Sequence, residues 1–314
     1  MLRRKKNGGH APLTLITLLL GLLMLTPPLY GGVKDKDEST ARDRAALKTT
    51  FQETEKSARD GDALAGARLA QMYYEGIGVK KDYKKALTWA LKAAKQGNTK
   101  AQSLLGLMHY KGHGVLRDYK AAFKWYHMAA LHGDKGAQSV IGLMYAAGHG
   151  VTRNYQEAFH WYEKAAEQGD AGAQSILGLM YYEGQAVPRD YKKAFKWYEK
   201  AALQGLSVAE LQLGVMYTYG NGVDQDYAKA FKWFQSASLR GNAKARASLG
   251  LMYAYGKGVK QDYEAAYMWL SLAADGKVDN AGAALESLQT KMSPEEIKEA
   301  QRRAEEFKRQ PISE

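Results

Sequence analysis

The sequence predicts an all-α solenoid in which six helix-turn-helix repeats of about 36 residues stack one after another. All six tryptophans of the 314-residue chain stand 36 positions apart: Trp89, Trp125, Trp161, Trp197, Trp233 and Trp269. A short polar residue that suits a helix N-cap recurs with the same period, always followed by Tyr: Asp82-Tyr83, Asp118-Tyr119, Asn154-Tyr155, Asp190-Tyr191, Asp226-Tyr227 and Asp262-Tyr263. One such unit cannot bury its own apolar face, so the copies must stack.

Residues 98–133 show how one repeat is built. The stretch 101–110 carries small and apolar residues on one side and is predicted to form the first helix. Glycines in the segment 112–115 end that helix. The second helix is predicted over residues 119–132, with Trp125 on its apolar stripe, so the tryptophans are expected in the core.

A glycine recurs in the middle of the first helix, where it costs about 1 kcal/mol relative to alanine. It is present in five copies: Gly106, Gly142, Gly178, Gly214 and Gly250. Its recurrence predicts a close crossing of two helices that leaves no room for a methyl group. The first copy has Ala70 at this position, which predicts a slightly looser crossing there.

Helices at both ends are predicted to cap the array. Residues 33–60 form a short charged tether and then a helix over 41–59, and the six repeats occupy residues 61–276. In the last copy the glycine that closes the second helix shifts by one position, to Gly276. The C-terminal caps occupy residues 277–314, with one helix over 281–291. A second begins with Ser293 as N-cap and Glu296 at the capping-box position.

Residues 1–32 are predicted to be a targeting segment, because residues 3–6 are basic and residues 13–25 are apolar. As a helix, the apolar run spans about 20 Å, less than the roughly 30 Å of a bilayer core, whereas residues 11–30 would just cross it. A cleaved signal peptide and an uncleaved membrane tether through residues 11–30 both stay open. In both cases the basic residues stay cytoplasmic and the repeats are exported. The protein is then periplasmic, or anchored in the inner membrane and facing the periplasm, with secretion as a further alternative.

The repeat pattern resembles the Sel1-like repeat, a relative of the tetratricopeptide repeat. The matching residues in the second copy are Leu105-Gly106 through Tyr110, Gly112, Gly114-Val115, Asp118-Tyr119, Ala122, Trp125-Tyr126, Ala129-Ala130 and Gly133. The fourth copy departs from the pattern, with Ala186 in place of the second loop glycine. The resemblance implies an α/α superhelix whose first helices line a concave face. It also implies an adaptor that acts in bacterial envelope, stress or host-interaction pathways.

The composition argues against several kinds of chemistry. The chain has no cysteine, which excludes disulfides, thiolate metal sites and cysteine nucleophiles. No Ser-x-x-Lys, Gly-x-Ser-x-Gly or His-Glu-x-x-His motif occurs, so we predict neither an enzyme nor a cofactor site. The net charge of +12 is dispersed beyond the N-terminus, which indicates a solvated face and no nucleic-acid partner. Some secreted Sel1-like proteins are described as penicillin-binding or β-lactamase-like. That group carries a cysteine pair in every repeat, so a β-lactamase-like or peptidoglycan-related activity is only an alternative here.

The histidines are unevenly distributed along the repeats. Six of them lie in the second and third copies: His109, His113, His127, His132, His149 and His160. His113 and His149 share one loop position, and its counterparts in other copies are Ile77, Gln185, Asn221 and Lys257. Such variety indicates a tolerant exposed position. We therefore predict no metal site, with a metal between adjacent loops as the alternative.

Candidate binding residues are found where the first helix varies between copies or carries a polar row. They are Tyr74, Gln102, Tyr110, Gln138, Gln174, Tyr182, Tyr219 and Tyr255. Amide rows suit an extended peptide and tyrosine is favoured at interfaces, although solvated or inter-repeat roles are an alternative. The sequence therefore predicts a non-enzymatic scaffold of the bacterial cell envelope that binds a protein or peptide in the concave groove. A secreted host-interaction (virulence) factor is the alternative.

Overall fold

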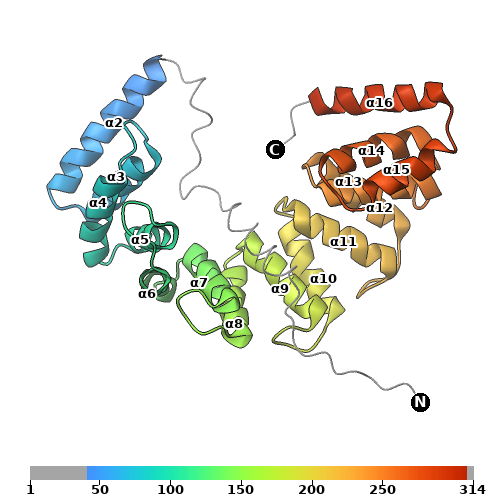
Figure 1. The fold of residues 1–314 in the computed structure, drawn as a ribbon. Helices are drawn as coiled ribbons and strands as arrows, with labels where there is room; N and C mark the ends of the chain where they lie inside the picture. Colours follow the sequence, from blue (N-terminus) through green and yellow to red (C-terminus); the bar gives the residue numbers. More distant parts are fainter. Residues whose placement is uncertain (1–40, 310–314) are drawn as a thin grey trace. The chain divides into compact units, whose positions relative to one another are not determined.

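The fold is the predicted all-α solenoid of helix-turn-helix repeats. The computed structural model describes residues 41–309, and within this range every regular element is a helix (Figure 1). The helices are α2 (Ala41–Arg59), α3 (Ala63–Glu75), α4 (Tyr83–Lys95), α5 (Thr99–Lys111), α6 (Tyr119–Leu131), α7 (Lys135–Ala147), α8 (Tyr155–Glu167), α9 (Ala171–Glu183), α10 (Tyr191–Ala202), α11 (Ser207–Tyr219), α12 (Tyr227–Leu239), α13 (Ala243–Tyr255), α14 (Tyr263–Asp275), α15 (Ala281–Gln289) and α16 (Pro294–Arg309). None of these helices is both long and apolar enough to cross a membrane. The predicted targeting segment, residues 1–32, lies outside the described residues.

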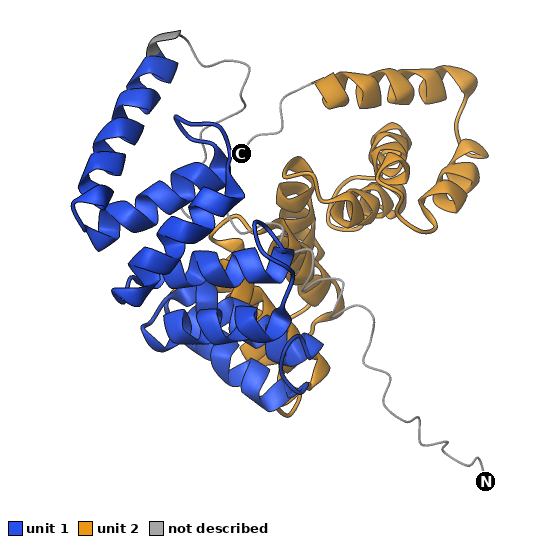
Figure 2. Ribbon diagram, turned by 60° about the vertical axis from the view of Figure 1, so that its left-hand side comes forward, with its two compact units in different colours: residues 1–168 blue, residues 169–314 orange. Residues whose placement is uncertain are grey.

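The helices divide into two compact units, residues 1–168 and 169–314 (Figure 2). Within each unit a helix packs mainly on its neighbours in the chain. The tightest pairs are the two helices of one repeat, such as α5 with α6 in the first unit and α11 with α12 in the second. The second helix of a repeat then packs on the first helix of the next, as α6 does on α7. Each unit is therefore held together by nearest-neighbour contacts, as expected for a repeat array.

The predicted N-caps of the second helices are present in all six copies. Each cap side chain accepts a hydrogen bond from an amide of the first turn, as Asp118 Oδ1 does from the amide nitrogens of Lys120 and Ala121 at 2.8 and 3.0 Å. The same role falls to Asp82, Asn154, Asp190, Asp226 and Asp262. These caps satisfy amide donors that a helix start otherwise leaves without partners, and they set where every second helix begins.

The shifted glycine of the last copy, Gly276, ends α14 as its C-cap, but it does not take the left-handed conformation of the other closing glycines. From Gly61 to Gly241 these glycines have φ between +82° and +99°, in the left-handed region. Gly276 instead has φ −75°, and the left-handed residue is Lys277, with φ +55°. Lys277 lies 36 positions after Gly241, so the backbone keeps its period even where the sequence no longer supplies a glycine. A lysine in this conformation is strained relative to glycine.

The mid-helix glycines make room for an aromatic ring from the second helix of the same repeat. A Cβ atom on Gly106 would lie 2.7 Å from ring carbons of Tyr126, which is buried. The same pairing joins Gly142 to Tyr162, Gly178 to Tyr198 and Gly214 to Phe234, with Leu270 facing Gly250. The feature that excludes a methyl group is thus a side chain of the second helix that fills the gap at the mid-helix glycine of the first helix; we call this gap the notch. The sequence pattern alone did not reveal this contact.

The first repeat uses a smaller version of the same pairing. It carries Ala70 at the glycine position and Ala90 at the ring position, and both alanines are completely buried. The methyl group of Ala70 meets no ring from α4, so it causes no collision there. The helices α3 and α4 pack on each other as closely as α5 and α6 do, so the expected looser crossing is not observed.

The tryptophans mark the repeat correctly, but most of them do not fill the core. Only Trp161 and Trp269 are buried, and the other four are half-buried. Lysine ammonium groups lie over some of the rings, for example Lys200 Nζ at 4.3 Å from the Trp197 centroid. The core position belongs to the next residue along the chain, Tyr126 in the second copy, because that residue points into the notch. Tryptophan lies toward the outer edge of the apolar stripe.

Helices at both ends complete the array. The helix α2 takes the place of a second helix before the first repeat, since Ala58 is buried and Gly78 abuts the backbone of Leu47. At the other end, Ser293 and Glu296 form the predicted capping box: Glu296 Oε2 accepts from the Ser293 amide at 2.7 Å, and Ser293 Oγ accepts from the Glu296 amide at 3.2 Å. This box starts α16.

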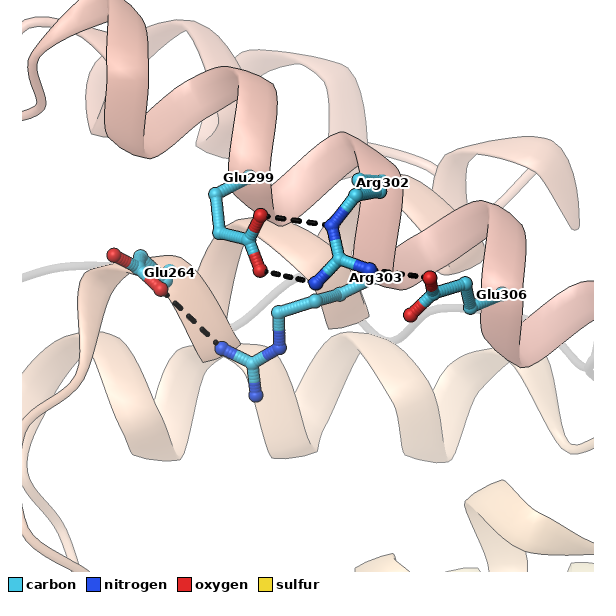
Figure 3. A network of polar contacts seen from close by, with 5 residues as sticks. All are labelled: Glu264, Glu299, Arg302, Arg303 and Glu306. Atoms are coloured by element: carbon cyan, nitrogen blue, oxygen red, sulfur yellow. Dashed lines mark hydrogen bonds and ion pairs between the residues drawn. The ribbon is translucent and has the colours of Figure 1, made fainter.

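The last helix, α16, packs on α14 and covers its outer side. Trp269 and Phe307 meet edge to face, with 5.1 Å between ring centroids. Arg303 of α16 reaches Glu264 at the start of α14, at 3.4 Å, beside the pairs that Arg302 makes with Glu299 and Glu306 (Figure 3). These exposed ion pairs add little to stability, so the apolar contact supplies most of the free energy of docking.

The notch predicts strong energetic coupling between Gly106 and Tyr126. G106A alone should destabilise the protein by about 1–3 kcal/mol, because the new methyl group overpacks the ring. In a Y126A background the same change should be neutral or stabilising, since the ring is gone and alanine favours the helix. Urea denaturation of the two single variants and the double variant measures the coupling. Effects that add to within about 0.5 kcal/mol would contradict the pairing.

Candidate functional site

The eight predicted binding residues fall into three groups in the structure. The three glutamines are buried, three of the tyrosines are half-buried and hydrogen-bonded, and the last two tyrosines are exposed. Only the exposed pair is free to meet a partner without rearrangement.

The glutamines lie between the helices of a repeat. Gln102, Gln138 and Gln174 are exposed by only 1%, 5% and 5%. Gln138 Oε1 accepts from Gln168 Nε2 at 2.7 Å, and Gln174 Oε1 accepts from Gln204 Nε2 at 2.8 Å. Each pair joins the start of a first helix to the end of the second helix of the same repeat. Their burial favours the alternative interpretation, in which the row is an internal contact.

The fifth repeat replaces this amide pair by charges. Glu210 occupies the glutamine position and is buried, and its Oε1 accepts from Ser236 Oγ at 2.7 Å. Arg240 Nε lies 3.4 Å from the same oxygen. The spacing of 30 residues is the same as in the two glutamine pairs. The contact is therefore a structural feature of the repeat, with exchangeable chemistry.

The half-buried tyrosines hydrogen-bond a loop residue of the next repeat. Tyr74 Oη lies 2.9 Å from His113 Nδ1, and Tyr110 Oη lies 3.0 Å from His149 Nδ1. Each imidazole also stacks on the tyrosine that follows the N-cap, with ring centroids 4.5 Å apart for His113 and Tyr83. For His149 and Tyr119 this distance is 4.6 Å. These contacts join consecutive repeats in the first unit.

The same joint recurs in the second unit with an amide instead of an imidazole. Asn221 Nδ2 donates to Tyr182 Oη at 2.9 Å, and Tyr182 packs edge to face on Tyr191. In all three joints the tyrosine and its partner are 39 residues apart. Where the tyrosine is replaced by Thr218, the partner position holds Lys257, whose ammonium lies 5.2 Å from the Tyr227 ring instead.

The loop position shared by His113 and His149 is thus a half-buried packing position in these copies, so the expectation that it is exposed is wrong there, whereas Lys257 at the same position is exposed. Burial lowers the pKa of both imidazoles, and the charges of Lys111 and Lys81 lower that of His113 further. Among residues 41–309, no cluster of three potential metal ligands is present. The residue at this loop position is His or Asn where a tyrosine stands 39 residues earlier, and Lys257 where Thr218 does. This correlation is the signal that the sequence analysis missed.

The remaining candidates, Tyr219 and Tyr255, are exposed by 71% and 67%. They end α11 and α13, which are the first helices of consecutive repeats in the second unit. In these two copies the tyrosine lies one position later than Tyr182 does in its copy, and this shift takes it out of the inter-repeat joint. Leu251, exposed by 41%, lies one turn before Tyr255 on the same helix face.

Comparisons with known proteins agree with this architecture. The Sel1 repeat family matches the chain six times, over residues 63–98, 99–134, 136–170, 171–206, 207–242 and 243–278. A solved structure of a protective antigen from uropathogenic Escherichia coli strains, described as having an SLR fold, is 36% identical with a TM-score of 0.74. The match covers 82% of this chain and 56% of that one, so the chain spans little more than half of that relative.

A second solved structure, a Sel1 repeat protein from Oxalobacter formigenes, is 33% identical with a TM-score of 0.68. The match covers 79% of this chain and 76% of that one. A comparison with curated proteins gives no match.

The hydrogen bonds of His113 and His149 predict that part of the protein's stability depends on pH. Their folded-state pKa values lie below the ordinary value of about 6.5, so the folded protein favours neutral imidazole. The stability that this contributes is present above about pH 6.5 and is lost as the pH falls through the folded-state pKa. The double variant H113N/H149N should keep the bonds to tyrosine, as Asn221 does, and should lose less stability than the wild type between pH 7.5 and pH 5.

Urea denaturation at the two pH values measures this difference. The matched control is H132N/H160N, which removes two exposed histidines from neighbouring helices. An equal loss of stability in the wild type and H113N/H149N would contradict the role of these joints.

Proposed function

The chain belongs to the Sel1 repeat family, and on this basis we propose that it is a non-enzymatic scaffold of the bacterial cell envelope that binds a protein through the first helices of its second unit. Sel1 repeat proteins are generally protein-interaction scaffolds, and a protein partner follows from that membership. The location in the cell envelope and the binding surface on the first helices are the parts that we propose.

The observation that carries the binding surface is the exposure of Tyr219 and Tyr255. Tyrosine places a large, rigid ring and one hydroxyl on a surface at low entropic cost, and it is enriched among residues that dominate binding energy. The two rings end neighbouring first helices, with Leu251 beside one of them. In the copies whose tyrosine hydrogen-bonds the next repeat, the position that corresponds to Tyr219 and Tyr255 holds a charged residue: Glu75, Lys111 and Glu183. The aromatic surface is therefore specific to the last two repeats.

The proposal of an envelope location rests on residues 1–32. A basic start followed by an apolar run favours export, either with cleavage or with a tether through residues 11–30. The E. coli relative is described as a protective antigen. This description favours a host-facing, secreted protein as the second candidate. Both candidates place the repeats outside the cytoplasm.

Photo-crosslinking tests the binding surface. A photoreactive phenylalanine analogue at position 219 or 255 of the full chain should capture the same protein in living cells. The analogue at position 131 or 203, where exposed leucines follow or end second helices, should not capture it. With that protein purified, Y219A/Y255A should weaken binding by at least about tenfold, because each ring is expected to contribute 1 kcal/mol or more.

The matched control for affinity is L131A/L203A, which removes exposed apolar side chains from the second helices. Equal affinities of the wild type and Y219A/Y255A for the captured protein would rule out this surface. Capture from positions 131 and 203 but not from 219 and 255 would do the same.

Fractionation of cells that express the full chain tests the location. The protein should be found in the periplasmic fraction or in the inner-membrane fraction. Mass spectrometry of its N-terminus should show residues 1–32 largely removed in the first case and retained in the second. Substituting Leu18 and Leu19 in the apolar run by aspartate should leave the protein in the cytoplasm, because charges at the centre of such a segment oppose insertion. A wild-type protein found only in the cytoplasm would refute export.

A further inference from the structure

Rows of lysine follow the outer side of several second helices. In α10 the row is Lys192, Lys196 and Lys200, four residues apart and all exposed. This spacing places the three ammonium groups on one helix face. Such a row exposes three like charges within three turns.

The same row recurs in other second helices of both units. It holds Lys84 and Lys92 in α4, Lys120 and Lys124 in α6, and Lys232 in α12, all exposed. No acidic residue occupies the row in α4, α6, α10 or α12. Among the described residues, none of these lysines has an ion-pair partner. Within residues 41–309 their charges are therefore not neutralised by a carboxylate in an ion pair.

The last repeat shows that this face can be covered. In α14 the row positions are Glu264, Met268 and Leu272, and both apolar side chains are buried. There α16 packs on α14, and its Arg303 pairs with Glu264 (Figure 3). The row is thus acidic and apolar where a helix of the chain docks on it, whereas it contains one to three lysines in the other second helices of the repeats.

The chemistry of the rows fits a diffuse anionic surface. Every cation in them is lysine, whereas arginine is the residue that suits bidentate recognition of individual phosphates. Lysines spread over several helices attract a layer of negative headgroups, each one contributing independently. Half-buried tryptophans lie beside the rows, with Lys92 Nζ and Lys200 Nζ at 5.0 and 4.3 Å from the Trp89 and Trp197 centroids. Indole rings favour the headgroup level of a membrane.

We propose that the lysine rows of the second helices dock on a membrane surface that carries anionic lipid headgroups. This surface is distinct from the first-helix tyrosines, so it holds whether or not those tyrosines bind a protein. Each unit by itself carries such rows on two of its second helices, α4 and α6 in the first unit and α10 and α12 in the second, and spread-out rows suit a diffuse layer of charge better than a single pocket would. Nucleic acid and acidic proteins are the competing partners that the experiment below distinguishes.

Lysine reactivity in the full chain tests the proposal. The protein is mixed with vesicles of phosphatidylcholine alone or of phosphatidylcholine with phosphatidylglycerol, and acetylation is read at each lysine by mass spectrometry. Lys192, Lys196 and Lys200 should react about fivefold more slowly on the anionic vesicles, the factor expected for an interaction of one lysine with such a surface. Lys111, Lys135 and Lys244 are exposed on first helices and should be unchanged.

The readout is specific to individual lysines, so insertion of residues 11–30 into both kinds of vesicle does not produce the difference. The variant K192Q/K196Q/K200Q should also lose the protection of Lys232 on the neighbouring second helix. The control K111Q/K135Q/K244Q removes the same charge from first helices and should retain that protection. Circular dichroism melts check that both variants are folded.

Three outcomes would overturn the proposal. One is equal reactivity of the row lysines on the two kinds of vesicle. Another is equal protection of the first-helix lysines, which would indicate attraction of the whole basic chain. The third is protection by duplex DNA, or by an acidic protein, without protection by anionic vesicles.

Discussion

The contact between a small residue in the middle of the first helix and a buried side chain of the second helix recurs in every repeat, and in four of the six repeats that side chain is an aromatic ring. Glycine in the middle of a helix is unfavourable, yet five copies retain it because a Cβ atom would collide with the second helix: with a buried ring in four copies, as at Gly106 and Tyr126, and with Leu270 at Gly250. The pair fixes the distance and the rotation of the two helices. In the first copy Ala70 lies opposite Ala90, so the methyl group is tolerated where the ring is absent.

Once the two helices are fixed, the caps and loops determine how the next repeat attaches. The N-cap begins each second helix, and the following tyrosine stacks on a loop residue of the next repeat, as Tyr83 does on His113. The left-handed residue of each loop also lies close to the preceding second helix: a Cβ on Gly114 would be 2.6 Å from the Tyr83 carbonyl oxygen. The joint between repeats is thus built from the same few residues each time.

The sequence was sufficient for the fold, because period, caps and glycines are local signals that repeat six times. It was less informative about which aromatic residue fills the core, since Trp125 and Tyr126 are neighbours on one stripe and a rotation of about 100° decides between them. For the candidate site, composition identified the tyrosines but not their exposure. The exposure depends on a difference of one position in the repeat: Tyr182 lies where it hydrogen-bonds Asn221 of the next repeat, whereas Tyr219 lies one position later and is exposed. The identity of the residue 39 positions later indicates whether a tyrosine is held in the joint. This can be used only after the structure has shown that the two positions are in contact.

The separation of roles between the helices explains how the chain varies without losing its fold. At the positions inside the notch and the joint, a change keeps a matching contact, as when Asn221 takes the place of a histidine as the partner of tyrosine. A change without such a match would leave a void or a polar group without its partner. Positions outside them change freely, and there the last two first helices gain exposed rings while several second helices gain lysines. The acidic and apolar row of α14, covered by α16, shows what this outer face becomes when a partner is built into the chain. A basic face that residues 41–309 leave uncovered on the same frame is where the proposed partner of opposite charge would take the place that α16 has on α14.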